Sequence, residues 1–209
     1  MKSTAAPTIV LLGVVLGAGG FALGKLGRLS AAAAEQRSRE HVEATLMANA
    51  PGEYDNDPLV DCQVRAVTPR ASSVPVKVAR HRYQLHGAPT GSLSLLRAPG
   101  GFGGPIKLIV VADAAGKVTR VSVLAHTETA GFGDAIDADK GNWGAIFIDS
   151  QLAGTTTTQW QVRTAGGSFD AISGATVTSG AMVAGVYDAL RADDAALTEE
   201  SCENIWRLP

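Results

Sequence analysis

The chain has 209 residues, of which 45% are hydrophobic, 18% charged and 5% aromatic, and its net charge is −2. This length fits one domain of ordinary size with an appendage. The composition excludes a disordered chain, a polybasic nucleic-acid-binding protein and a small disulfide-dense protein. The low aromatic content also argues against stacking of single-stranded nucleic acid, so we expect no nucleic-acid partner.

The N-terminal segment predicts a membrane anchor. Residues 3–24 carry no charge, and a helix of this length would cross the hydrocarbon core of a bilayer. Glycines spaced four residues apart in this segment would allow close contact with neighbouring helices in lipid. A secretory signal cleaved near residues 31–34 is the alternative. We expect a retained anchor with its flanks over residues 1–28, whose charges by themselves favour a cytoplasmic C-terminus.

A helical stalk is expected next, over residues 29–50. This stretch is rich in alanine, and Glu35 and Arg39 are spaced to pair one helical turn apart. A proline and a glycine at its end then break the helix. The remaining residues, 51–209, are expected to form the folded domain.

Short runs of β-forming residues predict strands in the first part of this domain. They occur at residues 74–85, 91–96, 106–111 and 118–125. Gly116 lies between the last two runs, which therefore predict an antiparallel hairpin.

The second part of the domain mixes helical and strand patterns. Apolar spacing predicts a short helix within residues 139–149, a strand within 155–164 and a longer helix over 178–192. Thr178 or Ser179 is the expected N-cap of that longer helix. The mixture indicates an α+β fold with mostly antiparallel strands.

Two cysteines, Cys62 and Cys202, flank the domain without a C-x-x-C spacing. A zinc or iron–sulfur site built by this chain alone is therefore not expected. A single disulfide and two separate buried thiols both remain open. In the acidic C-terminal tail, Ile205 and Trp206 are candidates to dock onto the core.

The segment before the longer helix carries the chemistry. Residues 170–179 are D-A-I-S-G-A-T-V-T-S. Gly174 would allow close backbone approach, Ala175 adds no bulk, and the first N–H groups of a helix point towards an anion. Hydroxyls such as those of Ser173 and Thr176 could hold phosphate oxygens or cap the helix. From these residues alone, a phosphate site and an ordinary capped helix start both remain possible.

The complete string Asp170-Ala-Ile-Ser-Gly-Ala-Thr resembles the flavinylation motif D-x-x-(S/T)-G-A-T of proteins that carry FMN as a phosphoester on the last threonine. Upstream, G-F-G-G-P-I at 101–106, H-T-E-T-A-G-F-G at 126–133, Trp143 and Phe147 resemble the series G-Y-x-G-x-I, E-T-P-G-(L/F)-G, W and F. That series belongs to RnfG, the FMN-bearing subunit of the Rnf electron-transport complex, and to its counterpart in the sodium-pumping NADH:quinone reductase. The single span and short length are more similar to RnfG.

The resemblance implies an FMN-binding domain over residues 51–209, with its flavinylation core at 101–192. It implies covalent FMN as the cofactor, attached through its phosphate to Thr176. It implies no catalytic residue and no metal in this chain. Ala130 stands where the family has proline, which loosens that loop without removing a functional group. The implied cofactor-binding residues are Thr176, Ser173, Gly174, Ala175, Glu128 and Thr129.

The function implied by the resemblance is electron relay within an Rnf-type complex that couples electron transfer to ion translocation. The implied partners are the other Rnf subunits, including a second flavinylated membrane subunit, and a flavin transferase during maturation. The implied location is the bacterial inner membrane, with one span and the domain on the periplasmic side. A single-span periplasmic adaptor and a stand-alone flavin reductase domain are the alternatives.

Overall fold

The computed structural model of the protein describes residues 34–69 and 74–207. Residues Ala44–Pro209 form one compact unit, and Met1–Glu43 are assigned to another. Residues 34–48 are helical, as the sequence predicts for this region. The predicted span at 3–24 falls outside the described residues. Among the residues that are described, no helix combines the length and apolar character needed to cross a membrane.

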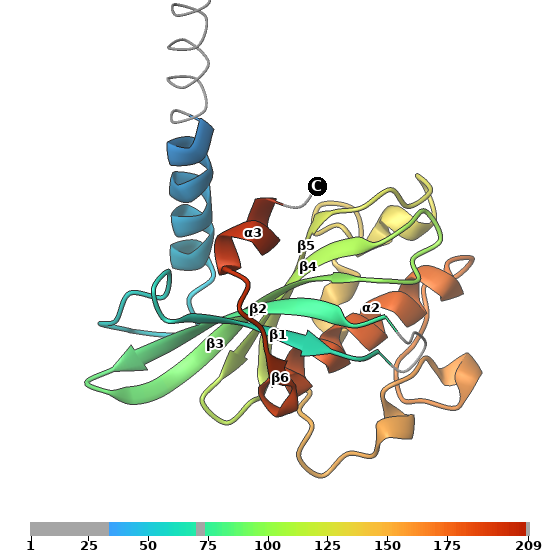
Figure 1. The fold of residues 1–209 in the computed structure, drawn as a ribbon. Helices are drawn as coiled ribbons and strands as arrows, with labels where there is room; N and C mark the ends of the chain where they lie inside the picture. Colours follow the sequence, from blue (N-terminus) through green and yellow to red (C-terminus); the bar gives the residue numbers. More distant parts are fainter. Residues whose placement is uncertain (1–33, 70–73, 208–209) are drawn as a thin grey trace, which may run out of the picture. The chain divides into compact units, whose positions relative to one another are not determined.

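An antiparallel sheet of six strands, in the order β5-β4-β3-β2-β1-β6, forms the centre of the compact unit (Figure 1). The strands are β1 (Cys62–Val67), β2 (Val76–Leu85), β3 (Ala88–Ala98), β4 (Ile106–Asp113), β5 (Val118–Ala125) and β6 (Ala196–Leu197). The α+β class with antiparallel strands is thereby confirmed, as is the hairpin of β4 and β5.

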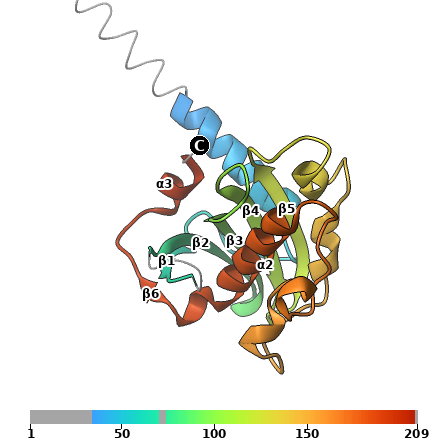
Figure 2. The same ribbon diagram turned by 90° about the vertical axis from the view of Figure 1, so that its right-hand side faces the viewer.

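Helix α2 (Thr176–Leu190) lies across one face of the sheet, where it packs on β3 and β4 (Figure 2). Its apolar residues, Met182 and Val186 among them, form the main core with strand residues such as Leu96 and Leu108. Gly185 allows the close approach, because a Cβ there would lie 2.6 Å from the Cβ of Ala98. This contact holds α2 close against β3.

Two predictions between β5 and α2 need correction. The strand expected within 155–164 is wrong, because the chain there forms the short 3₁₀ helices η3 (Thr157–Gln159) and η4 (Arg163–Ala165). The helix expected within 139–149 is only the 3₁₀ helix η2 (Trp143–Phe147). Phe147 and Trp160 anchor these turns in the core, so their apolar periodicity reflects loop anchoring and not regular secondary structure.

The C-terminal tail packs on the face of the sheet opposite α2. Helix α3 (Cys202–Arg207) buries Ile205 and Trp206, as expected, and a disulfide joins Cys62 to Cys202. Lys107 of β4 donates a hydrogen bond of 2.8 Å to the carbonyl oxygen of Trp206. The disulfide settles the question that the cysteine spacing leaves open, and it ties the tail to β1.

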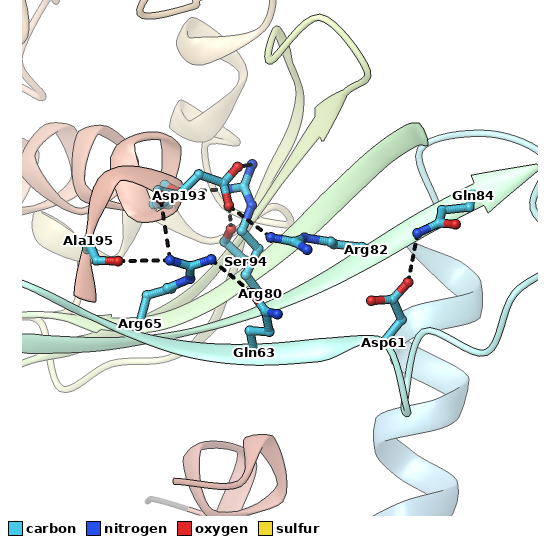
Figure 3. Close-up of polar contacts among 10 residues, drawn as sticks. Asp61, Gln63, Arg65, Arg80, Arg82, Gln84, Ser94, Asp193 and Ala195 are labelled. Atoms are coloured by element: carbon cyan, nitrogen blue, oxygen red, sulfur yellow. Dashed lines mark hydrogen bonds and ion pairs between the residues drawn. The ribbon is translucent and has the colours of Figure 1, made fainter. Parts of the chain in front are cut away.

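Arg80 of β2 holds the C-terminal end of α2, and Arg65 of β1 holds the segment that follows it (Figure 3). The buried Arg80 guanidinium donates to the carbonyl oxygen of Ala189, at 3.1 Å, and lies 3.0 Å from the Asp193 carboxylate. Arg65 donates to the carbonyl oxygen of Ala195 at 2.9 Å. Burial lowers the pKa of Arg80, and the nearby Asp193 carboxylate opposes that shift. Positive charge at this end complements the helix dipole.

Candidate functional site

A cavity of about 530 Å³ opens where two loops meet the start of α2. Its volume is typical of small-molecule sites, which occupy about 300–1,000 Å³. The lining is mostly apolar with a few polar groups. It consists of Phe102, Glu128, Thr129, Phe132, Gly133, Gly174, Ala175, Thr176, Val177 and Thr178.

Thr176 is the first residue of α2, and it is exposed at this cavity. Ala175 is the N-cap, and no side chain of the described residues caps the helix. The first N–H groups of a helix lack partners within the helix and favour an anion. Gly174 has φ of 77°, and a Cβ there would meet the Phe132 ring at 3.1 Å. A glycine at this turn therefore lets the chain enter α2 with Thr176 at the cavity.

The N-cap prediction for Thr178 or Ser179 is wrong, because α2 begins at Thr176 and both residues lie inside it. Their hydroxyls are buried and bind neighbouring segments. The Ser179 hydroxyl accepts the Ile172 N–H at 2.9 Å and donates to the carbonyl oxygen of Ala175 at 3.0 Å. The Thr178 hydroxyl donates to the Glu128 carboxylate. These bonds fasten the first turn of the helix to the loops around it.

Glu128 joins three walls of the cavity. Its side chain accepts the Thr178 hydroxyl through Oε2 and the Gly103 N–H, at 3.0 Å, through Oε1. The residue is only 8% exposed. Gly133 permits this arrangement, because a Cβ there would lie 2.9 Å from the Glu128 Cβ. Both carboxylate oxygens are therefore engaged within the protein, and the cofactor-binding role that the resemblance implies for Glu128 stays a prediction.

Exposed apolar side chains form the rim of the cavity. Phe102 is 74% exposed, Phe132 is 56% exposed and Val177 is 53% exposed. Apolar groups clustered in this way mark a ligand or partner site. The cofactor-binding residues named from the sequence do not include these three side chains, although Phe132 belongs to the same loop as Glu128 and Thr129. The available signal was an aromatic residue within each of the two glycine-rich loops.

The structure brings together most of the site residues predicted from the sequence. Ser173 is exposed but does not line the cavity. Asp170, at the start of the motif, forms an ion pair of 2.7 Å with Arg163 and lines a separate cavity of about 520 Å³ around Trp160. The predicted residues that do line the first cavity are Thr176, Gly174, Ala175, Glu128 and Thr129.

A cluster of charged and polar side chains lies next to the cavity loop in the sequence but does not line the cavity. His126 Nε2 lies 3.0 Å from Asp137 Oδ1, and Lys140 Nζ lies 3.0 Å from Asp137 Oδ2 and 3.1 Å from Asp134 Oδ2. Hydrogen bonds to Asp137 and Asp134 raise the pKa of Lys140. The bond from Lys140 lowers the pKa of Asp134. Burial opposes ionisation of Asp137, but bonds from His126 and Lys140 bring its pKa below the ordinary value.

The residues present fit FMN. The N-terminal N–H groups of α2 suit a phosphate, and Thr176 offers a hydroxyl beside them. Phe102, Phe132 and Val177 offer apolar surface for a planar ring system. These groups lie around one cavity.

Comparisons with known proteins agree with this interpretation. A family model described as the FMN-binding domain matches residues 101–191. The chain is 37% identical over 168 residues to the G subunit of the ion-translocating oxidoreductase complex of Pseudomonas aeruginosa, covering 80% of this chain and 76% of that protein. The corresponding protein of Vibrio cholerae serotype O1 is 35% identical over 165 residues, covering 78% and 77%. That of Photorhabdus laumondii is 34% identical over 153 residues, covering 72% and 71%.

The antiparallel sheet, the cavity at the start of α2 and the family match define an FMN-binding-domain protein. Within that class, the chain belongs to the RnfG family, the G subunits of ion-translocating oxidoreductase complexes.

Proposed function

We propose that this protein is a membrane-anchored flavoprotein subunit that relays electrons through FMN bound covalently to Thr176. The observation that carries the proposal is the position of Thr176, exposed at the cavity on the first turn of an uncapped helix. Its hydroxyl is accessible to an enzyme that adds the cofactor. The same N–H groups that favour an anion would then hold the phosphoester.

Attachment requires a separate flavin transferase with FAD as the donor. The Thr176 oxygen forms a bond to the FMN phosphorus, the pyrophosphate bond of FAD breaks, AMP leaves and the hydroxyl proton is released. Thr176 is thus the substrate of maturation, and no catalytic residue of this chain is needed. A tethered cofactor is not lost by dilution, so the cavity can remain open for electron exchange.

When bound, FMN supplies the redox chemistry, and the protein supplies placement and electrostatics. Phe102 and Phe132 provide apolar contact for the ring system, while Glu128 holds the two loops against α2. The relatives are named as subunits of ion-translocating oxidoreductase complexes. The corresponding partners of this chain are other subunits of such a complex, including a second flavinylated membrane subunit.

Residues 3–24 form the proposed anchor, in the bacterial inner membrane with the domain on the periplasmic side. The Cys62–Cys202 disulfide supports this location, because disulfides persist in oxidising compartments. The span carries no ionisable side chain, so this chain alone offers no ion path. Ion translocation belongs to the assembled complex.

Mass spectrometry tests the proposal on full-length protein purified from membranes of a host that flavinylates other proteins. Trypsin releases residues 164–191 as one peptide, since no Lys or Arg lies between Arg163 and Arg191. We expect this peptide to carry the mass of FMN minus water, and Thr176→Ala to abolish it. Thr158→Ala, at an exposed threonine outside the cavity, should leave it unchanged. An unmodified wild-type peptide would contradict the proposal and favour the adaptor function.

A further inference from the structure

The loop that follows β5 is held by its own first residue, His126, which does not line the cavity. His126 Nδ1 accepts the backbone N–H of Glu128 at 3.0 Å, and its Nε2 lies 3.0 Å from Asp137 Oδ1. A ring nitrogen that accepts an N–H carries no proton, so the proton of neutral His126 is on Nε2 and is donated to Asp137. The His126 side chain is 13% exposed. Its orientation is therefore fixed at both nitrogens.

The far end of the same loop is held by the same group of charges. Asp134 follows the cavity residues Phe132 and Gly133, and Lys140 bridges it to Asp137. The cavity segment from Glu128 to Gly133 thus lies between a bond at its start and an ion pair directly after its end. The bonds that His126 and Lys140 make to the Asp137 and Asp134 carboxylates are stronger than bonds between neutral groups, because the carboxylates are ionised.

Glu128 links the His126 side chain to the residues that line the cavity. Its backbone is held by His126, whereas its carboxylate holds Thr178, two residues beyond Thr176, and Gly103, next to Phe102. We propose that His126, braced by Asp137 and Lys140, is a positioning residue that sets the place of the Glu128 carboxylate at the flavin. This inference rests on the proposed function, because it assumes FMN in the cavity.

The inference has an electrostatic consequence. A carboxylate beside the flavin disfavours the arrival of further negative charge, and this interaction weakens with distance. Among the residues lining the cavity there is no Lys, Arg or His to offset it. If the His126 bond is lost, the Glu128 backbone loses one of its restraints, so the carboxylate can shift from its place beside the flavin and the flavin becomes easier to reduce. A role confined to fold stability would leave the reduction potential unchanged.

Side-chain amides can replace one ring nitrogen at a time. His126→Asn keeps an acceptor near the Nδ1 position, whereas His126→Gln keeps a donor near Nε2 and loses the acceptor for Glu128. His86→Asn is the matched control, because His86 is 86% exposed and belongs to the turn between β2 and β3. Full-length flavinylated proteins would be compared by midpoint potential and by hydrogen–deuterium exchange of residues 126–134.

We expect His126→Gln to raise the midpoint potential and to increase exchange at the Glu128 amide. His126→Asn should restore both towards wild type, and His86→Asn should change neither. Flavinylated His126→Gln with the wild-type potential and exchange would overturn the inference. A wild-type protein without FMN would contradict the proposed function instead. Exchange in the flavin-free Thr176→Ala protein still tests the His126–Glu128 bond in that case.

Discussion

The indole N–H of Trp206 donates a hydrogen bond of 3.0 Å to Nε2 of the buried His81. The other ring nitrogen, Nδ1, lies 2.8 Å from the carbonyl oxygen of Pro58 and donates its proton there. Burial lowers the pKa of His81 to about 4, and the bond to Pro58 opposes this shift. His81 is therefore neutral in the folded protein and joins α3 to β2.

Acid should weaken the fold through this residue. The unfolded chain binds a proton at His81 below pH 6.5, whereas the folded chain does so only near pH 4. The contribution of His81 to the free energy of unfolding is thus fully present above pH 6.5. It falls by about 2 to 3 kcal/mol as the pH falls towards 4. Urea unfolding at pH 7 and pH 4.5 would measure the change. In His81→Gln the loss should be smaller by that amount, and equal losses in both proteins would contradict this assignment.

Removal of the disulfide should loosen the C-terminal tail. The Cys62–Cys202 bond has a sequence separation of 140, so it restricts a large part of the unfolded chain. We expect Cys202→Ser to lower the free energy of unfolding by about 2 to 5 kcal/mol. Hydrogen exchange should rise first in α3. Cys62→Ser and the double variant should behave alike, whereas free thiols in the unreduced wild type would show that the bond does not form.

Thr178 and Glu128 should stabilise the fold jointly, through the hydrogen bond between their side chains. In Thr178→Val, one oxygen of a buried carboxylate loses its donor, which costs about 1 to 3 kcal/mol. Glu128→Gln removes an acceptor and a negative charge, so it should also raise the flavin midpoint potential. A double-mutant cycle on urea unfolding measures the coupling. Additive effects would mean that the two side chains act independently.

Two glycines of α2 allow a matched pair of variants that tests how the helix packs on the sheet. In Gly185→Ala, the new methyl group would meet Ala98 of β3, so we expect a loss of about 1 to 3 kcal/mol. Gly180→Ala adds its methyl group to open space, so it should stabilise the helix by up to about 1 kcal/mol. Thermal unfolding would compare them. If both variants were stabilised, the packing of α2 on β3 would differ from that described.

The sequence predicts much of this fold because local patterns coincide with tertiary structure in the hairpin of β4 and β5 and in α2. It does not predict β1 or α3, which are short and held by distant partners, through the disulfide and His81. At the candidate site, the motif includes Thr176, which lines the cavity, but no local pattern pairs Glu128 with Thr178, which is 50 residues away. The sequence does not reveal the role of His126 either, because its partners become neighbours only after the loop folds.

The two ends of α2 are held by different parts of the protein, Ala189 by Arg80 and Thr178 by Glu128. A helix that is held at both ends cannot move relative to the sheet to carry a cofactor from one partner to another. A cofactor on Thr176 would reach only as far as the torsions of one side chain and its phosphate allow. The distance between electron donor and acceptor would then be set when the whole domain docks, so its orientation in the assembled complex would govern the rate of electron transfer.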